Sequence, residues 1–428
     1  MTSMRDAFQR VRRDPWSSLF AEIALWCFVA LLVTGAILTV FFEPDMTRVA
    51  YHGTYVPLRD VPVSRAYAST LHVSLEVRGG LLVRQIHHWA ALIFIAAVTL
   101  HLLRMFFTGA FRRPRRLVWL IWVTLLVLGM AAGWSGTILP DDMLSGGSLE
   151  LLRSVIQSIP LVGTHLAYWL FGGDFPGQEI IPRFYWLHVL VLPVVMAGLF
   201  VPLRRRVRLE SFRLAFSTFG ILALLATFAQ INPVWQYGPY RPGDITSGAV
   251  PGWYMGFMDG AVRIMPGWEF TVAGHPVTLA VLVPALLVPG AFFTVLAAYP
   301  WIEHRFTADD HDVTLTRTAV GVAGITFYGL LWAAAANDQI AYHFQLSLYG
   351  VTWFFRLAVF AGPLLAYIIT LRIHLGLTRR EEYEAAHGRE TGRIVMDPGG
   401  GFHELHEPRV DHRDGDAVVT RPSPRAVR

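Results

Sequence analysis

The chain has 428 residues, of which 54% are hydrophobic and 16% are charged. Soluble proteins carry about 25% charged residues, so an ordinary cytosolic enzyme and a disordered chain are excluded. A single cysteine excludes a disulfide scaffold. The formal net charge is +5, but the basic residues cluster between apolar segments, which argues against nucleic-acid binding. The composition predicts an all-α polytopic membrane protein.

Eight apolar segments are long enough to cross a membrane, which takes about 20 residues. Only helices satisfy their backbone polar groups within one such segment in lipid. We therefore expect eight transmembrane helices. They cover about 17–42, 82–109, 117–139, 184–203, 212–231, 277–300, 317–336 and 349–376.

Arginine clusters predict the orientation of these segments. Clusters precede the first span and follow the second and the fourth. If every segment crosses once, all of them lie on one side, which the positive-inside rule identifies as cytoplasmic. The chain is then a multi-pass protein of the cell membrane with both termini cytoplasmic.

The same pattern suggests three parts. The first part, 1–210, has four helices and holds the candidate histidines. The second, 211–378, has four further helices and a long outer loop at 232–276. The third, 379–428, is a polar cytoplasmic tail that we expect to be mostly disordered toward its end.

Histidines in the second and fourth spans suggest a cofactor. His87 and His101 are 14 residues apart, which places them about 21 Å apart on one helix face. Arg84 and Arg104 lie near them, and heme iron takes imidazole ligands while arginine pairs with carboxylates such as propionates. His188, at the outer end of the fourth span, can face His87 across an outer heme. The alternative is a set of buried, hydrogen-bonded histidines.

Several longer motifs resemble one family. They include SRAYAS, RGGLLVRQIHHWAALIF, LPDDMLSG, FGGDFPGQEIIPRFYWLHVL, WYMGFMDGAVRIMP and HGRETG, and they run through nearly the whole chain in family order. The chain resembles the cytochrome b subunit of actinobacterial bc1-type menaquinol–cytochrome c reductases. This resemblance implies a four-helix bundle for two b-type hemes, four further helices, and a menaquinol site at the outer face. It also implies a homodimer in membrane lipid with a Rieske iron–sulfur subunit and a cytochrome c subunit.

Matched position by position, the resemblance implies a complete outer heme site. His87 and His188 would be the iron ligands. Gly35 and Gly136 would let two helices approach the macrocycle edge, because a Cβ would fill that space. Arg84 would meet a propionate.

The inner heme site departs from the family. The second ligand there should lie 14 or 15 residues after the outer one, where this chain has Pro202 and Leu203. The small residues expected 14 positions before the outer glycines are Ala21 and Trp122. We therefore expect side chains to fill the inner pocket and His101 to bond to a neighbouring helix. One heme b is then bound, where the family has two.

The outer quinol motif also departs from the family. The family has Pro-Glu-Trp-Tyr or Pro-Asp-Trp-Tyr, whereas this chain has Pro251, Gly252, Trp253 and Tyr254. The carboxylate that takes a quinol proton is missing, and Asp259 is a weak substitute because the family also has an acid there. We expect Pro251, Trp253 and Tyr254 to line an apolar pocket for a quinone ring, without a certain catalytic residue.

Three functions remain open at this point. The first is a redox subunit that oxidises menaquinol at the outer face. The second is a divergent single-heme paralogue that serves another oxidoreductase or senses the redox state. The third is a structural or assembly protein without heme, which the complete outer ligand set disfavours. A transporter is disfavoured because the chain has no internal repeat.

Overall fold

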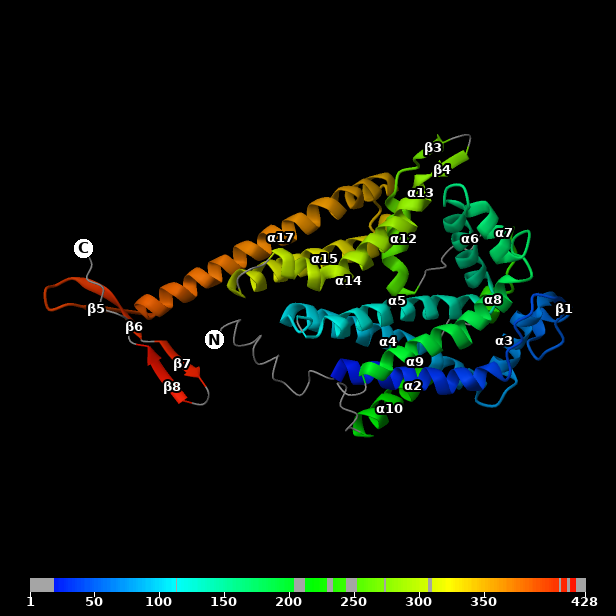
Figure 1. Ribbon diagram of the computed structural model, residues 1–428, viewed down its shortest axis with the longest axis horizontal. Helices are drawn as coiled ribbons and strands as arrows, with labels where there is room; N and C mark the ends of the chain where they lie inside the picture. Colours follow the sequence, from blue (N-terminus) through cyan, green and yellow to red (C-terminus); the bar gives the residue numbers. More distant parts are fainter. Residues whose placement is uncertain are drawn as a thin grey trace. The chain divides into compact units, whose positions relative to one another are not determined.

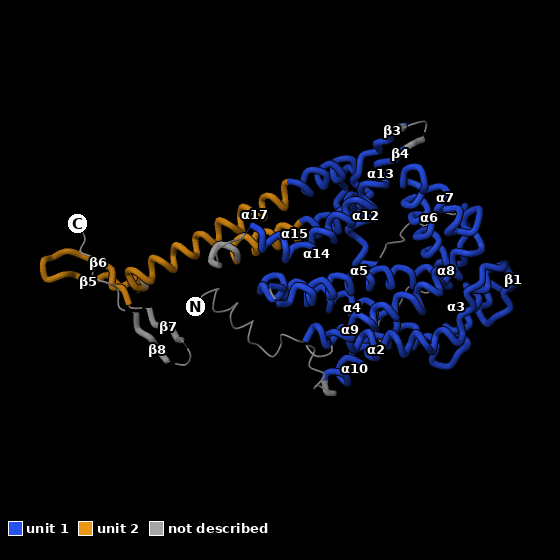
Figure 2. Tube along the Cα trace, viewed as in Figure 1, with its two compact units in different colours: residues 1–308, 327–360 blue, residues 309–326, 361–428 orange. Residues whose placement is uncertain are grey.

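The computed structural model describes residues 19–112, 114–203, 212–228, 234–243, 252–272, 275–306, 310–407, 409–413 and 416–420. The chain divides into two units (Figure 2). They are Met1–Ala308 with Phe327–Phe360, and Asp309–Thr326 with Ala361–Arg428.

Sixteen α-helices account for most of the described residues. They are α2 (Leu19–Thr39), α3 (Arg65–Leu75), α4 (Gly80–Thr108), α5 (Arg116–Ile138), α6 (Met143–Gln157), α7 (Gly163–Phe171), α8 (Ile180–Trp186), α9 (Leu192–Leu203), α10 (Phe212–Phe228), α11 (Val234–Tyr237), α12 (Gly256–Ile264), α13 (Leu279–Leu282), α14 (Val288–Phe306), α15 (Asp310–Ala334), α16 (Asn337–His343) and α17 (Leu348–His387).

Shorter elements connect these helices. The 3-10 turns are η2 (Val56–Leu58) and η4 (Trp253–Met255), and the π-helical turns are η3 (Leu187–Val191) and η5 (Val283–Leu287). The strands form four antiparallel pairs: β1 (Arg48–Ala50) with β2 (Pro62–Ser64), β3 (Glu269–Val272) with β4 (His275–Thr278), β5 (Arg389–Met396) with β6 (Phe402–Glu407), and β7 (Arg409–Arg413) with β8 (Asp416–Thr420).

The all-α polytopic class is confirmed, but the count of eight spans is not. Among the described residues, six helical segments are long and apolar enough to cross a membrane. A seventh arises if α15 and α16, bent by 64°, are one span. Residues 212–228 form α10, which is shorter than a span and packs against α2 and α4. The expected continuation of this segment to residue 231 lies outside the described residues.

Small residues bring the first two spans together. Helices α2 and α4 lie side by side in the ribbon diagram (Figure 1). Ala24 and Ala30 of α2 and Ala90 and Ala97 of α4 are at most 3% exposed. In lipid, where helices associate by close packing, small residues allow backbones to approach. These two helices pack against each other more extensively than any other pair of elements in the first unit, and α5 and α9 complete a four-helix bundle.

The fourth span is continuous but not regular. It runs over Ile180–Leu203 and contains the π-helical turn η3, in which the Leu192 amide donates to the Leu187 carbonyl. Pro193 follows directly and has no amide proton for the normal helical bond. Such π-turns are frequent at functional sites, and this one contains His188.

The tail begins with regular structure. Helix α17 continues to His387, beyond the predicted boundary at residue 378. The hairpin β5–β6 follows it, with Glu390 paired with His406 and Met396 with Phe402, and β7 pairs with β8. The disorder expected toward the end of the tail stays a prediction, since residues 421–428 lie outside the described residues.

Candidate functional site

The rings of His87 on α4 and His188 on η3 lie next to each other. Their ring centroids are 6.1 Å apart with an interplanar angle of 67°. Metal–imidazole bonds are about 2 Å long, so two imidazole nitrogens that would hold one iron would lie about 4 Å apart. Each ring centroid lies behind its nitrogen, so a centroid separation of 6.1 Å suits such a pair. The two helices therefore bring together the two histidines that the sequence analysis paired.

Thr34 fixes the proton of His87. Its hydroxyl donates to the Ala30 carbonyl at 2.6 Å and lies 2.9 Å from His87 Nδ1. Because the hydroxyl proton is already used, Nδ1–H donates to this oxygen. The lone pair of Nε2 is then free to bind a metal.

Ser135 does the same for His188. Its hydroxyl donates to the Ala132 carbonyl at 3.0 Å and lies 3.1 Å from His188 Nδ1. Both histidines are thus held in the tautomer in which Nε2 can coordinate a metal. The sequence analysis missed these two hydroxyls, although a hydroxyl residue directly precedes each outer glycine.

The two outer glycines lie against these rings. A Cβ on Gly35 would lie 3.3 Å from His87 Cε1, and a Cβ on Gly136 would lie 2.7 Å from His188 Cε1. Any larger residue at position 136 would displace the His188 ring. The glycines thus give the two histidine rings room to pack, and the donor set fits a heme held by two histidines.

Arg84 lies one turn before His87 on α4. Its Nη1 donates to Ser74 Oγ at 3.2 Å, so the side chain is oriented toward α3. Its assignment to a propionate stays a prediction.

The inner level is filled by aromatic side chains. Trp122 is 1% exposed, and its ring centroid lies 4.5 Å from that of His101. Ala21 and Leu203 are also buried in this core. A ring packed on His101 leaves no space for a macrocycle on that side, so the residues here do not fit a second heme.

Three phenylalanines close the space beside Trp122. Phe28, Phe94 and Phe200 contact one another with centroid separations between 5.2 and 6.5 Å. Phe200 also contacts Trp122 at 6.0 Å. The interior is therefore packed rather than open at this depth, as crystal-like packing density requires.

The expected hydrogen bond of His101 to a neighbouring helix is wrong for Nδ1. This atom is buried and has no hydrogen-bond partner in the described part of the chain. The Trp122 ring packs beside His101, with centroids 4.5 Å apart, and the indole supplies volume there rather than a polar partner for Nδ1.

Tyr254 connects the quinol motif to the outer histidine level. It is 4% exposed, and a Cβ on Gly133 would lie 2.6 Å from its hydroxyl oxygen. Gly133 is one turn from Gly136 on α5, and burial raises the pKa of Tyr254 to about 12, so the phenol stays protonated. Trp253 is 37% exposed, and Pro251 lies outside the described residues.

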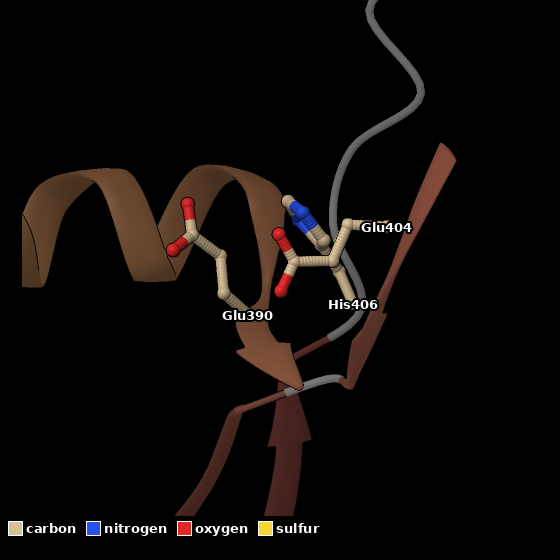
Figure 3. Close-up of side chains that lie close together, drawn as sticks. All are labelled: Glu390, Glu404 and His406. Carbon is tan, nitrogen blue, oxygen red and sulfur yellow. The ribbon is translucent and has the colours of Figure 1, made fainter. Parts of the chain in front are cut away.

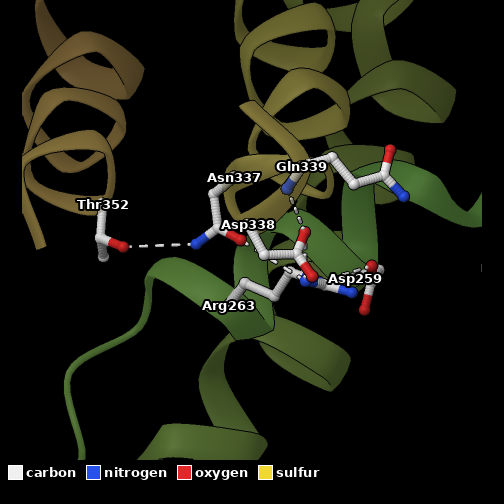
Figure 4. A network of polar contacts seen from close by, with 6 residues as sticks. All are labelled: Asp259, Arg263, Asn337, Asp338, Gln339 and Thr352. Carbon is white, nitrogen blue, oxygen red and sulfur yellow. Dashed lines mark hydrogen bonds and ion pairs between the residues drawn. The ribbon is translucent and has the colours of Figure 1, made fainter. Parts of the chain in front are cut away.

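Asp259 forms an ion pair with a neighbouring arginine (Figure 4). Arg263 Nε lies 3.0 Å from Asp259 Oδ2, and Arg263 Nη1 lies 3.1 Å from Asp338 Oδ1. Burial raises the pKa of Asp259, and the Arg263 guanidinium opposes this shift. The network joins α12 to α16, and Asn337 extends it to Thr352 of α17.

Asp141, which follows the third span, is an unusual buried acid. Its backbone has a φ of 52°, its side chain is fully buried, and neither carboxylate oxygen has a hydrogen-bond partner of good geometry within the described ranges. Burial raises the pKa of Asp141 to about 6, while Ser64 and Arg48 oppose the shift. The sequence analysis did not single out this residue.

Replacing Asp141 by asparagine should change the pH dependence of stability. The folded protein keeps a proton that the unfolded chain, with a pKa of about 3.9, releases, so stability falls as pH rises from about 4 to about 6, by about 3 kcal/mol. Asp141→Asn cannot ionise. Its melting temperature relative to the native protein should therefore be higher at about pH 7.5 than at about pH 4.5.

Thermal unfolding in detergent at both pH values measures this difference. Asp60→Asn is the matched control, because Asp60 also has a positive φ, 58°, but an exposed side chain. It should leave the pH dependence unchanged. An equal difference at both pH values for Asp141→Asn would show that this carboxyl is not protonated in the folded protein.

Comparisons with known proteins give the family of the chain. The family model "Cytochrome b(N-terminal)/b6/petB" matches residues 92–203. The "Cytochrome bc1 complex cytochrome b subunit" of Streptomyces coelicolor is 44% identical over 94% of this chain and 80% of its own length. That of Mycobacterium tuberculosis is also 44% identical, over 95% of this chain and 80% of its own length. The chain belongs to the family of bc1-complex cytochrome b subunits.

The fold is found in a solved structure as well. A chain of "Hyperthermophilic respiratory Complex III" has a TM-score of 0.60 and 17% identity, covering 83% of this chain and 92% of that one. The present cytochrome b subunit is a heme-containing electron-transfer protein of the membrane. Its outer histidine pair is intact and its inner level is filled.

Proposed function

We propose that this cytochrome b subunit takes electrons from menaquinol at its outer face and holds a single heme b. The observation that carries the proposal is the position of Tyr254, which reaches Gly133 one turn from the glycine that borders His188. When bound, the heme supplies a one-electron carrier at this level. Tyr254 and Trp253, at right angles with centroids 6.0 Å apart, offer an apolar wall to the quinone ring.

A single heme has a consequence for the direction of electron flow. The next histidine level lies about 21 Å away along α4, and there Trp122 occupies the space beside His101. Transfer across the membrane through two carriers in series is therefore not supported by these residues. This filled pocket favours the second candidate role. In that role the chain is a single-heme paralogue that serves another oxidoreductase or senses the quinone redox state.

Proton transfer is the weak step of the proposed reaction. Gly252 offers no carboxylate, and Asp259 is paired with Arg263. A positioned base contributes about 10²–10⁴-fold to a rate. Menaquinol oxidation by the native chain should accordingly be slow.

The substitution Gly252→Glu tests this proposal. It restores the acid and should raise the rate of heme reduction by menaquinol at least about tenfold, a smaller gain than the 10²–10⁴-fold of a fully positioned base, because Tyr254 must move to make room. A Cβ at this position would lie 2.7 Å from Tyr254 Cε1, so the Tyr254 ring must rotate. Stopped-flow absorbance of the heme measures the rate.

Gly252→Ala is the control, because it displaces Tyr254 in the same way without adding an acid. No increase is expected for it. The role assigned to the missing base is wrong if the native protein already oxidises menaquinol at a rate that glutamate does not improve, or if alanine improves it equally.

The arginine clusters support a topology in which both termini are cytoplasmic. The relatives named above belong to bc1 complexes, which supports assembly as a homodimer with a Rieske iron–sulfur subunit and a cytochrome c subunit.

A further inference from the structure

The hairpin β5–β6 gathers three metal-binding side chains (Figure 3). Glu390, Glu404 and His406 each place a ligand atom within 4.8 Å of the others. Glu390 is directly opposite His406 in the register, and Glu404, two residues before His406, lies on the same face of β6. The cluster therefore follows from strand pairing.

The orientation of His406 is fixed from outside the cluster. Its Nδ1 lies 2.9 Å from the backbone carbonyl of His387, at the end of α17. A carbonyl only accepts, so Nδ1–H is the donor and Nε2 is the ring nitrogen left for a metal. Histidines that bind metals almost always donate their other ring N–H in this way.

Glu404 is positioned by a register shift in the pairing of β5 with β6. The pairing shifts between Glu390 and Ile394, and the Gly392 amide, at a φ of 69°, donates to Glu404 Oε1 at 2.6 Å. This leaves Oε2 of the same carboxylate available. The hydrogen bond aims the carboxylate without neutralising it.

The negative charge of the two glutamates is not balanced by a described side chain. Neither carboxylate forms an ion pair with an arginine in the part of the chain that the structure describes. Two carboxylates within 4.8 Å of each other repel, and a cation between them removes the repulsion. The site thus combines two carboxylates with an imidazole nitrogen.

We propose that Glu390, Glu404 and His406 form a binding site for a divalent cation of the zinc class. An imidazole ligand favours zinc over magnesium and calcium, which prefer sites made only of oxygen. Three protein ligands leave a fourth tetrahedral position for water. The site is independent of the heme and of the proposed quinol reaction.

Zinc titration of the full-length, heme-loaded protein in detergent tests the site. Isothermal titration calorimetry with Zn²⁺ should show one site, and His406→Asn and the double variant Glu390→Gln/Glu404→Gln should each weaken it at least about tenfold, because losing even outer-shell partners of a metal costs 10–100-fold. Zinc per heme after dialysis should fall in parallel.

His403→Asn is the matched control. His403 is on the opposite face of β6 and pairs with Asp397 at 2.8 Å, so its loss should leave the zinc affinity unchanged. Equal binding by native protein and by the His406 and glutamate variants overturns the proposal. So does an equal loss with His403→Asn, since that shows unspecific binding by tail histidines.

Discussion

Purified native protein should contain one heme b per chain, and His87→Ala or His188→Ala should abolish it. Both residues are needed because each would supply one imidazole ligand to the iron, and the centroids of the two rings lie 6.1 Å apart. His101→Ala should retain the full heme content, since Trp122 covers that ring. Pyridine hemochrome analysis against protein concentration gives the ratio directly.

Two further variants separate ligation from folding. Thr34→Val and Ser135→Ala keep both ligands but remove the hydroxyls that fix the Nδ1 protons. Loss of such outer partners costs about 10–100-fold in metal affinity. Thr39→Val is the control, because the Thr39 hydroxyl donates to the Ala36 carbonyl in an exposed hydrogen bond and touches neither histidine among the described contacts. A ratio near two hemes, or loss of heme in His101→Ala, contradicts the single-site interpretation.

Long apolar segments made most of the helices predictable. The second span was expected at 82–109, and the structure has Gly80–Thr108, because Gly79 and Gly109, at φ values of 77° and 68°, lie at its two ends. Structure in the polar segments was harder to predict. The hairpin β1–β2 and the tail hairpins depend on backbone pairing, which produces no hydrophobic periodicity in the sequence.

In the candidate site, too, some residues could be predicted from the sequence and others could not. The pairing of His87 with His188 followed from spacing and family position, and the structure brings their rings together. The hydroxyls of Thr34 and Ser135 were missed because serine and threonine in helices usually bond their own backbone. Here they do so and accept a histidine proton as well, which only the packing of two helices reveals.

Trp122→Ala should destabilise the bundle by about 3 kcal/mol. Large-to-small changes of buried tryptophan cost about 3–5 kcal/mol, in part because a cavity remains, and the lower end applies since helices in lipid associate by packing rather than by exclusion from water. Trp122 is 1% exposed and touches His101 and Phe200. Its loss opens a space next to an unpartnered His101 Nδ1.

Denaturant titration in mixed micelles, followed by circular dichroism, measures this loss. Trp301→Ala is the matched control, because Trp301 is 45% exposed and should cost little. The outer heme should remain bound in Trp122→Ala, since its ligands are on another level of the bundle. If Trp122→Ala is as stable as Trp301→Ala, the tryptophan does not hold the inner level closed, and the volume argument for a single heme fails with it.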